Sequence, residues 1–278
     1  MSRVILHLSD LHFGRISPGL PEALLEAARR IAPDLVVVSG DLTQRATVVE
    51  FEQARAFLDQ LPYPRIVVPG NHDVPLHNLY ARFVRGLSRF KSQITEDLAP
   101  VYQDAEMAVF GVNTARSLTW KGGRINSSQI EGLRTHLCAT SPDIARIVVT
   151  HHPFEVPQGF QPHDVVGSAR TALERWTDCG ADLLLCGHLH VGDSTTTMHR
   201  YGHVGWRTIV VTAGTATSTR GRGAPNSFNA IRVENRQNVG VAKWSWDETA
   251  RGFHKLSEAH YLRTADGWVP RMNDPSAP

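Results

Sequence analysis

The sequence has few cysteines, little net charge and no long apolar run. Its three cysteines, Cys138, Cys179 and Cys186, are odd in number and lack a Cys-x-x-Cys spacing, which argues against a disulfide framework and fits a reducing compartment. The formal net charge of +2 gives no reason to expect a nucleic-acid or membrane partner. No segment approaches the length of a membrane span, and the N-terminus lacks the pattern of a signal peptide. We therefore expect a cytoplasmic protein.

The sequence does contain five short apolar runs rich in β-branched residues, and each run ends in a polar cluster. The runs are residues 3–8, 34–38, 65–68, 146–150 and 182–186. The clusters that follow them hold, in order, Asp10 and His12, then Asp41, then Asn71, His72 and Asp73, then His151 and His152, and finally His188 and His190. Such runs, with Gly or Pro at the turn, predict strands. Ligands in open α/β sheets gather outside the carboxyl ends of the strands, so the clusters can converge in space.

The residue types in these clusters favour a metal centre. Asp10 and His12 are two residues apart, so in an extended segment both side chains leave on the same side, and His188 and His190 repeat this spacing. Imidazole and carboxylate ligands without thiolate favour Mn, Fe, Zn or Co, and there are more candidates than one tetrahedral ion needs. The sequence therefore predicts two divalent metal ions, with Asp41 as the carboxylate that both ions share.

Each cluster alone has a simpler interpretation, because Gly, Asn and Asp are common in tight turns. The metal interpretation depends on all five clusters occurring in order. Of the two adjacent histidines we assign His151 as the ligand because it follows the strand directly, and we expect His152 to lie behind the ligands or to face the substrate. His7 lies inside the first strand, where we expect a core or sheet residue.

In this order the motifs resemble those of the calcineurin-like metallophosphoesterases. The matching motifs are Asp10-x-His12, Gly40-Asp41, Gly70-Asn71-His72-Asp73, His151-His152-Pro153 and Gly187-His188-Leu189-His190. The resemblance extends from Ile5 to about Phe228 and is greatest to bacterial class III cyclic nucleotide phosphodiesterases and their glycerophosphodiesterase relatives. It implies an α/β fold, a four-layer αββα sandwich with two mixed β-sheets.

The resemblance also implies a role for each motif residue. The first metal would be bound by Asp10, His12, Asp41 and His190, and the second by Asp41, Asn71, His151 and His188. His72 would be the catalytic residue that stabilises charge on the phosphoryl oxygens or protonates the leaving alkoxide. Asp73 would hold the turn or orient a ring nitrogen. A hydroxide that bridges the two metals would attack the phosphodiester.

We expect residues 1–262 to form a single domain and residues 263–278 to form a polar C-terminal tail. Residues 75–106 are longer than a simple connection and could equally be a cap over the active site or an added packing helix. Capping boxes at Thr47-x-x-Glu50 and Ser128-x-x-Glu131 predict helix starts. After Gly187 the pattern changes to strands without long helices.

The substrate is less well determined than the reaction. Residues 212–223 form a loop of small hydroxyl residues and glycines, in which Arg220 and Arg222 could contact a phosphate. We expect metal-dependent hydrolysis of a small phosphodiester, with a 3′,5′-cyclic nucleotide such as cAMP as the leading substrate. The alternatives are a glycerophosphodiester, a nucleic acid end, a UDP-sugar lipid pyrophosphate or a non-catalytic scaffold on the same fold. The sequence leaves open whether the chain forms a homodimer.

Overall fold

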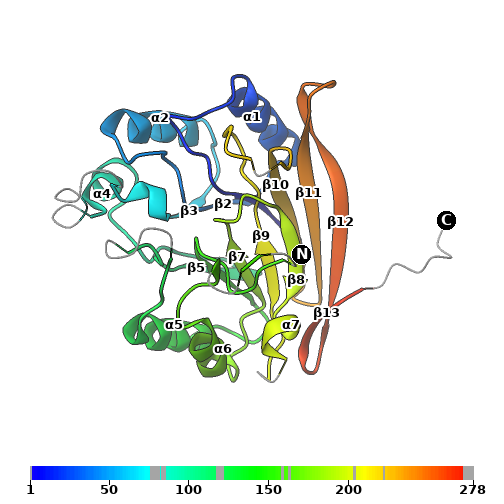
Figure 1. Ribbon diagram of the computed structural model, residues 1–278. Helices are drawn as coiled ribbons and strands as arrows, with labels where there is room; N and C mark the ends of the chain where they lie inside the picture. Colours follow the sequence, from blue (N-terminus) through cyan, green and yellow to red (C-terminus); the bar gives the residue numbers. More distant parts are fainter. Residues whose placement is uncertain are drawn as a thin grey trace, which may run out of the picture.

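The computed structural model describes residues 2–75, 82, 86–116, 122–157, 160–161, 164–202, 205–221 and 223–271. Within these ranges the chain forms two β-sheets that lie face to face, with helices on the outer side of each (Figure 1). Three hydrophobic cores separate the four layers. The predicted αββα sandwich is therefore confirmed. None of the described helices is long and apolar enough to cross a membrane.

The first sheet has, within the described residues, the strand order β13-β12-β11-β10-β1-β2-β3. Its strands are β1 (Ser2–Leu8), β2 (Leu35–Ser39), β3 (Arg65–Val68), β10 (Ser227–Glu234), β11 (Asn238–Asp247), β12 (Gly252–Thr264) and β13 (Gly267–Pro270). β1, β2 and β3 are parallel, whereas β10 to β13 form an antiparallel meander that joins the sheet beside β1. The sheet is mixed, and the change to a meander after Gly187 agrees with the sequence pattern.

The second sheet has the order β4-β5-β6-β7-β9-β8 over the same described ranges. Its strands are β4 (Val101–Gln103), β5 (Met107–Gly111), β6 (Ala145–Val149), β7 (Leu183–Cys186), β8 (Asp193–Thr196) and β9 (Ile209–Thr212). The inner four strands are parallel, and β4 and β8 are antiparallel edge strands. β5, β6 and β7 are buried along their whole length, as expected for parallel strands covered on both faces.

The helices form the two outer layers, with α1 and α2 over the first sheet and α5 and α6 over the second (Figure 1). They are α1 (Leu20–Ile31), α2 (Val48–Leu58), the 3-10 helix η1 (Asn71–Asp73), α4 (Ser88–Gln93), α5 (Ser127–Ala139), α6 (Ala169–Trp176) and α7 (Met198–Tyr201). α2 begins at the predicted capping box of Thr47 and Glu50. The cap of α5 is Asn126 and not the predicted Ser128, because the capping box is formed by Asn126 and Gln129. The helix therefore begins at Ser127.

Two predictions made from composition are wrong in the structure. Residues 263–270 are not a tail, because they complete β12 and form β13, where the side chain of Trp268 is fully buried. Thr264 and Asp266, at the turn between the two strands, are exposed, which made the segment look loose. Residues 272–278 lie outside the described residues. Cys138 and Cys179 form a disulfide, although we expected none, because α5 and the end of α6 lie side by side with a Cα–Cα distance of 4.8 Å.

The segment predicted as a cap, residues 75–106, is described only in part. Its helix α4 packs against α2 through Phe90, which is fully buried and lies 6.3 Å from the ring of Phe51. The end of the segment includes β4, an edge strand of the second sheet. The described part thus contributes packing, and a cap formed by the other residues stays a prediction.

Candidate metal centre

The predicted ligands gather at one edge of the sandwich. β1, β2 and β3 in the first sheet and β6 and β7 in the second all end there, because parallel strands present their carboxyl ends to the same side. The side chains that the structure brings together at this edge are Asp10, His12, Asp41, Asn71, His151, His188 and His190.

Five of these residues have a left-handed backbone, which is uncommon for residues other than glycine. Their φ angles are 53° for Asp10, 49° for His12, 53° for Asp41, 71° for His188 and 62° for His190. Such conformations carry strain and persist only where neighbouring structure holds them, typically at functional sites. Here the backbone N–H of Asp10 donates to the carbonyl of Gly40 at 3.1 Å, and that of His12 donates to the carbonyl of Asp41 at 3.0 Å.

The first ligand group comprises Asp10, His12 and His190, with Asp41 beside it. Asp10 Oδ1 lies 3.6 Å from His12 Nε2 and 3.4 Å from His190 Nε2, and Asp41 Oδ2 lies 3.7 Å from His12 Nε2. These separations are long for hydrogen bonds. They suit atoms that share a tetrahedral ion at about 2.1 Å, which would stand about 3.4 Å apart.

Two atoms of this group provide an independent test of whether the first ligand group fits a metal ion. Asp10 Oδ1 and His12 Nε2 are buried and have no hydrogen-bond partner among the described residues. Buried polar atoms are nearly always satisfied, so this pair requires an explanation. A bound cation would satisfy both atoms, and the residues present therefore fit a metal ion.

The second ligand group lies on the other side of Asp41. Asp41 Oδ2 is 3.4 Å from His151 Nε2. Asn71 Oδ1 is 3.1 Å from His151 Nε2 and 3.1 Å from His188 Nδ1. His151 Nδ1 donates to the carbonyl of Ser39 at 2.8 Å, which leaves Nε2 unprotonated in the neutral ring and free to bind a metal. The same oxygen of Asp41 thus faces both groups.

Gly40 has a conformation and a position that favour glycine. Its φ is +92°, and a Cβ there would lie 2.6 Å from His151 Nδ1. A larger residue would push the ring away from Asp41 and Asn71. The glycine of the Gly-Asp motif is therefore explained by its close approach to the ring of His151.

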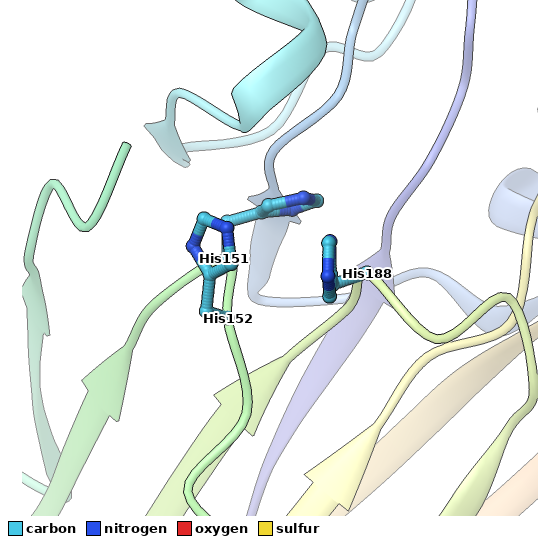
Figure 2. A group of neighbouring side chains, drawn as sticks. All are labelled: His151, His152 and His188. Atoms are coloured by element: carbon cyan, nitrogen blue, oxygen red, sulfur yellow. The ribbon is translucent and has the colours of Figure 1, made fainter. Parts of the chain in front are cut away.

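His152 lies closer to the ligands than we expected. Figure 2 shows the rings of His151, His152 and His188 converging above the ends of β6 and β7. One nitrogen of each ring lies within 4.8 Å of the others, which makes the three a further group that could hold a metal ion. His152 Nδ1 is 2.8 Å from Thr114 Oγ1, and this contact orients the ring.

His72 lies over the centre but belongs to none of the possible ligand groups within the described part of the chain. Its backbone N–H donates to Asp41 Oδ1 at 2.8 Å, and its ring lies 4.9 Å from that of His12. Nδ1 is 2.9 Å from the carbonyl oxygen of Gln44, and Nε2 is 2.7 Å from Arg220 Nη1. These partners fit a neutral ring in which Nδ1–H donates to Gln44 and Nε2 accepts from Arg220. Burial, the largest influence, lowers the pKa of His72.

Asp73 lies beneath the turn and is fully buried. Its carboxylate accepts hydrogen bonds from the backbone N–H groups of Gly70 at 2.9 Å, Leu42 at 3.2 Å and Thr43 at 3.0 Å. It also accepts from the hydroxyl of Thr43 at 3.0 Å. These bonds tie the end of β3 to the loop after β2, so Asp73 holds the geometry of both ligand loops.

The electrostatics of the metal-free site favour charged pairs. Burial alone would raise the pKa of Asp10 and of Asp41, but the surrounding imidazoles outweigh it and lower both values. Burial likewise would lower the pKa of His151, but Asp41 raises it to about 9. Without metal, a proton on His151 therefore supplies part of the positive charge that Asp41 requires.

Sequence reasoning missed two residues that support the first ligand loop. The hydroxyl of Thr215 donates to the carbonyl of Asp10 at 2.7 Å, and that of Thr217 donates to the carbonyl of Leu11 at 2.8 Å. The run of hydroxyl residues in the loop after β9 was noticed, but its partners are backbone carbonyls, which no sequence pattern identifies. Of the two arginines in this loop, Arg220 reaches His72, and Arg222 lies outside the described residues.

Comparison with known proteins agrees with this geometry. Residues 3–192 match the family model described as calcineurin-like phosphoesterase. A probable cyclic nucleotide phosphodiesterase from Synechococcus sp. is 24% identical over 176 residues, which cover 60% of this chain and 64% of that protein. The glycerophosphodiester phosphodiesterase GpdQ from Enterobacter lignolyticus is 25% identical over 213 residues, which cover 71% of this chain and 73% of that protein.

The architecture is also similar to a solved structure, the purple acid phosphatase PPD1 from yellow lupin. The TM-score is 0.73 at 13% sequence identity, and the alignment covers 95% of this chain and 54% of that chain. At this identity the likeness concerns the fold. The match to the cyanobacterial relative spans just under two thirds of that protein's length, so the comparisons indicate the kind of site and leave the substrate to be determined.

Proposed function

Because the chain belongs to the calcineurin-like phosphoesterase family, we propose that it is a phosphodiesterase that works with two divalent metal ions. One observation carries the proposal. Asp41 Oδ2 lies 3.7 Å from His12 Nε2 in one ligand group and 3.4 Å from His151 Nε2 in the other. A carboxylate in this position can be shared between two ions, which is the arrangement that two-metal hydrolysis requires.

The ligands divide into two sets around this shared carboxylate. The first ion would be held by Asp10, His12, Asp41 and His190, and the second by Asp41, Asn71, His151 and His188, with His152 near the second set. When bound, two such ions polarise the phosphoryl group and lower the pKa of a water molecule between them. Mn, Fe, Zn and Co all suit these donors.

We assign His72 and Arg220 to act on the substrate, because both are partly exposed beside the mostly buried ligands. His72 is held through its backbone by Asp41 and through Nδ1 by Gln44, so its Nε2 is directed away from both anchors. Arg220 Nη1 occupies the place beside Nε2, where a phosphoryl oxygen would stand. We assign Arg220 to donate to that oxygen, which frees Nε2 of His72 to take up a proton from solvent. The protonated ring then stabilises the charge, or gives this proton to the leaving oxygen and returns to its neutral form. For Arg222, which lies outside the described residues, contact with the substrate phosphate stays a prediction from the sequence.

The relatives favour small diesters as substrates. One is named as a probable cyclic nucleotide phosphodiesterase and the other as a glycerophosphodiester phosphodiesterase. We propose a 3′,5′-cyclic nucleotide such as cAMP, with a glycerophosphodiester, a nucleic acid end and a UDP-sugar lipid pyrophosphate as alternatives. A non-catalytic scaffold would have no need for Asp10 Oδ1 and His12 Nε2 to be buried without a hydrogen-bond partner among the described residues. A cytoplasmic location stays a prediction from the sequence, which leaves open whether the chain forms a homodimer.

The test compares two substrates, 3′,5′-cAMP and the generic diester bis(p-nitrophenyl) phosphate. The enzymes are Mn²⁺-loaded wild type, His72→Ala and, as a matched control, His254→Ala, which alters an exposed histidine on β12 far along the meander. We expect the wild type and the control to cleave both substrates and His72→Ala to lose turnover. Cleavage of the generic diester alone would keep the mechanism and exclude cAMP. Cleavage of neither by the metal-loaded wild type would contradict the proposed function.

A further inference from the structure

His7 lies inside β1, three residues before Asp10, and its side chain is fully buried. Its Nε2 is 2.9 Å from Ser39 Oγ, and Ser39 Oγ is 3.4 Å from the carbonyl oxygen of Leu8. Burial lowers the pKa of His7 to about 3, so the imidazole is neutral and carries a single N–H. These contacts are satisfied when Nε2–H donates to the hydroxyl of Ser39 and that hydroxyl donates to Leu8.

Ser39 connects this buried pair to the metal centre. It is the last residue of β2 and stands two residues before Asp41. Its carbonyl oxygen accepts a hydrogen bond from His151 Nδ1 at 2.8 Å and another from Ser9 Oγ at 3.1 Å. The first of these bonds sets the tautomer of His151 and directs Nε2 toward Asp41 and Asn71. His7 and His151 thus bond to the same residue, His7 to the side chain of Ser39 and His151 to its backbone carbonyl.

Packing alone does not favour histidine at this position. His7 Nδ1 is buried and has no hydrogen-bond partner in the part of the chain that the structure describes. An unsatisfied buried polar atom is costly, and an apolar residue of similar size would avoid this cost. Ile5, two positions earlier and on the same face of β1, is an apolar core residue of this kind. The donor on Nε2 is the feature that an apolar residue lacks.

We propose that His7 is a positioning residue for the metal centre. By holding the side chain of Ser39 it fixes the Ser39 carbonyl, and through that carbonyl it fixes the orientation and tautomer of His151. The inference rests on the proposed function only in taking His151 as a ligand of the second ion. Residues that orient metal ligands typically contribute 10–100-fold to metal affinity. His7 acts one hydrogen bond further away, so we expect an effect of about tenfold, at the lower end of that range.

The experiment measures metal binding instead of turnover. Metal-free wild type, His7→Leu, His7→Gln, Ser39→Ala and the double variant His7→Leu/Ser39→Ala are titrated with Mn²⁺ by calorimetry. In the Mn²⁺-free proteins, nitrogen-15 spectra of histidine are recorded well above pH 9, where the His151 ring has lost its extra proton, and they report the tautomer of its neutral form. Thermal unfolding shows whether each variant is folded.

We expect His7→Leu and Ser39→Ala each to weaken binding of the second ion about tenfold and to leave the first ion within about threefold. The double variant should lose no more than either single variant, because both substitutions remove the same hydrogen bond. His7→Gln should stay within about threefold of the wild type, since its amide nitrogen can take the place of Nε2. The spectra should show His151 as a mixture of tautomers in His7→Leu and as a single tautomer in His7→Gln.

Three results would overturn the inference. The first is wild-type affinity in both His7→Leu and Ser39→Ala. The second is an equal loss in His7→Leu and His7→Gln with normal binding in Ser39→Ala, which would indicate a packing role. The third is an additive loss in the double variant. If His7→Leu does not fold, Ser39→Ala and His7→Gln decide the question. Failure of the wild type to cleave any diester would contradict the proposed function and leave these titrations unaffected.

Discussion

The two sheets contribute different chemistry to the edge where they meet. The first sheet supplies both carboxylates and the amide, from residues Asp10, His12, Asp41, Asn71 and His72. The second sheet supplies imidazoles alone, from residues His151, His152, His188 and His190. The negative charge of the site and most of its neutral nitrogen ligands therefore come from opposite sides of the central core. In the proposed assignment neither sheet supplies all the ligands of either ion, so metal binding should depend on how the sheets are packed.

The largest effect is expected from removing the shared carboxylate of the first sheet. Asp41→Ala should lose both metal ions, because Asp41 Oδ2 faces both ligand groups. Hydrolysis of bis(p-nitrophenyl) phosphate should fall by at least about 10³-fold. Metal content by mass spectrometry is the direct measurement, and retention of one ion per chain would show that the two groups do not share Asp41.

His72 belongs to the first sheet but to neither ligand group. His72→Ala should keep both ions and lose turnover by about 10²–10⁴-fold, the usual range for a general acid or base. The same metal analysis and assay apply to this variant. Loss of metal equal to that in Asp41→Ala would contradict the separate roles of the two residues.

Each histidine ligand of the second sheet should affect one ion only. His188→Ala removes an imidazole that lies 3.1 Å from Asn71 Oδ1 in the second group. We expect the second ion to bind at least about 100-fold more weakly and activity to recover at high Mn²⁺. The matched variant His190→Ala should weaken the first ion instead. A metal titration of both variants measures the difference, and loss of both ions from either one would remove the distinction between the groups.

The second sheet also differs in its outer layer, which contains the disulfide between Cys138 and Cys179. The bond closes a loop with a sequence separation of 41, so in the chain-entropy model it should contribute about 4 kcal/mol to the free energy of unfolding. Denaturant unfolding with and without reductant measures this contribution. Cys138→Ser should match the reduced wild type, and metal stoichiometry should not change. An unchanged unfolding midpoint under reductant would contradict the prediction.

The smallest effect links the two sheets through pH. In the metal-free protein Asp41 of the first sheet raises the pKa of His151 of the second from 6.5 to about 9. A raised folded-state pKa gives stability that is complete below pH 6.5 and is lost as pH rises through 9. The free energy of unfolding of the metal-free protein should therefore fall by about 3 kcal/mol across this window.

Metal replaces the proton on His151, so the metal-loaded protein should show no such fall. Denaturant unfolding at several pH values, with and without Mn²⁺, measures both curves. Parallel curves for the two forms would show that His151 is not protonated in the metal-free state.

The resemblance to the metallophosphoesterases implied the two-sheet fold. The strand pattern predicted that the five clusters converge, because parallel strands end at the same edge and Gly or Pro marks the turns. The sequence did not predict the roles of Thr215 and Thr217, whose hydroxyls donate to backbone carbonyls, or of Ser39, whose carbonyl accepts from His151, because the fold alone brings these groups together. The start of α5 was displaced because Asn126 and Ser128 are equally good helix caps, and the pairing with Gln129 decides between them.

The disulfide and β13 depend on which surfaces meet in space. Cys138 and Cys179 lie far apart in the sequence, and only the packing of α5 against α6 brings them together. Trp268 is the one large apolar residue in a polar segment, and it is buried where its Nε1 donates to Asp182 Oδ1 at 3.0 Å. A single aromatic residue carries too little pattern to predict a strand.

The central claim is that one carboxylate joins the ligands of both sheets into a two-metal site for diester hydrolysis. The most direct test is the rate of hydrolysis of bis(p-nitrophenyl) phosphate by metal-free wild type as Mn²⁺ is added stepwise. We expect no hydrolysis without metal and a rate that rises until two equivalents per chain are bound. A rate that is complete after one equivalent, or that needs no metal, would contradict it.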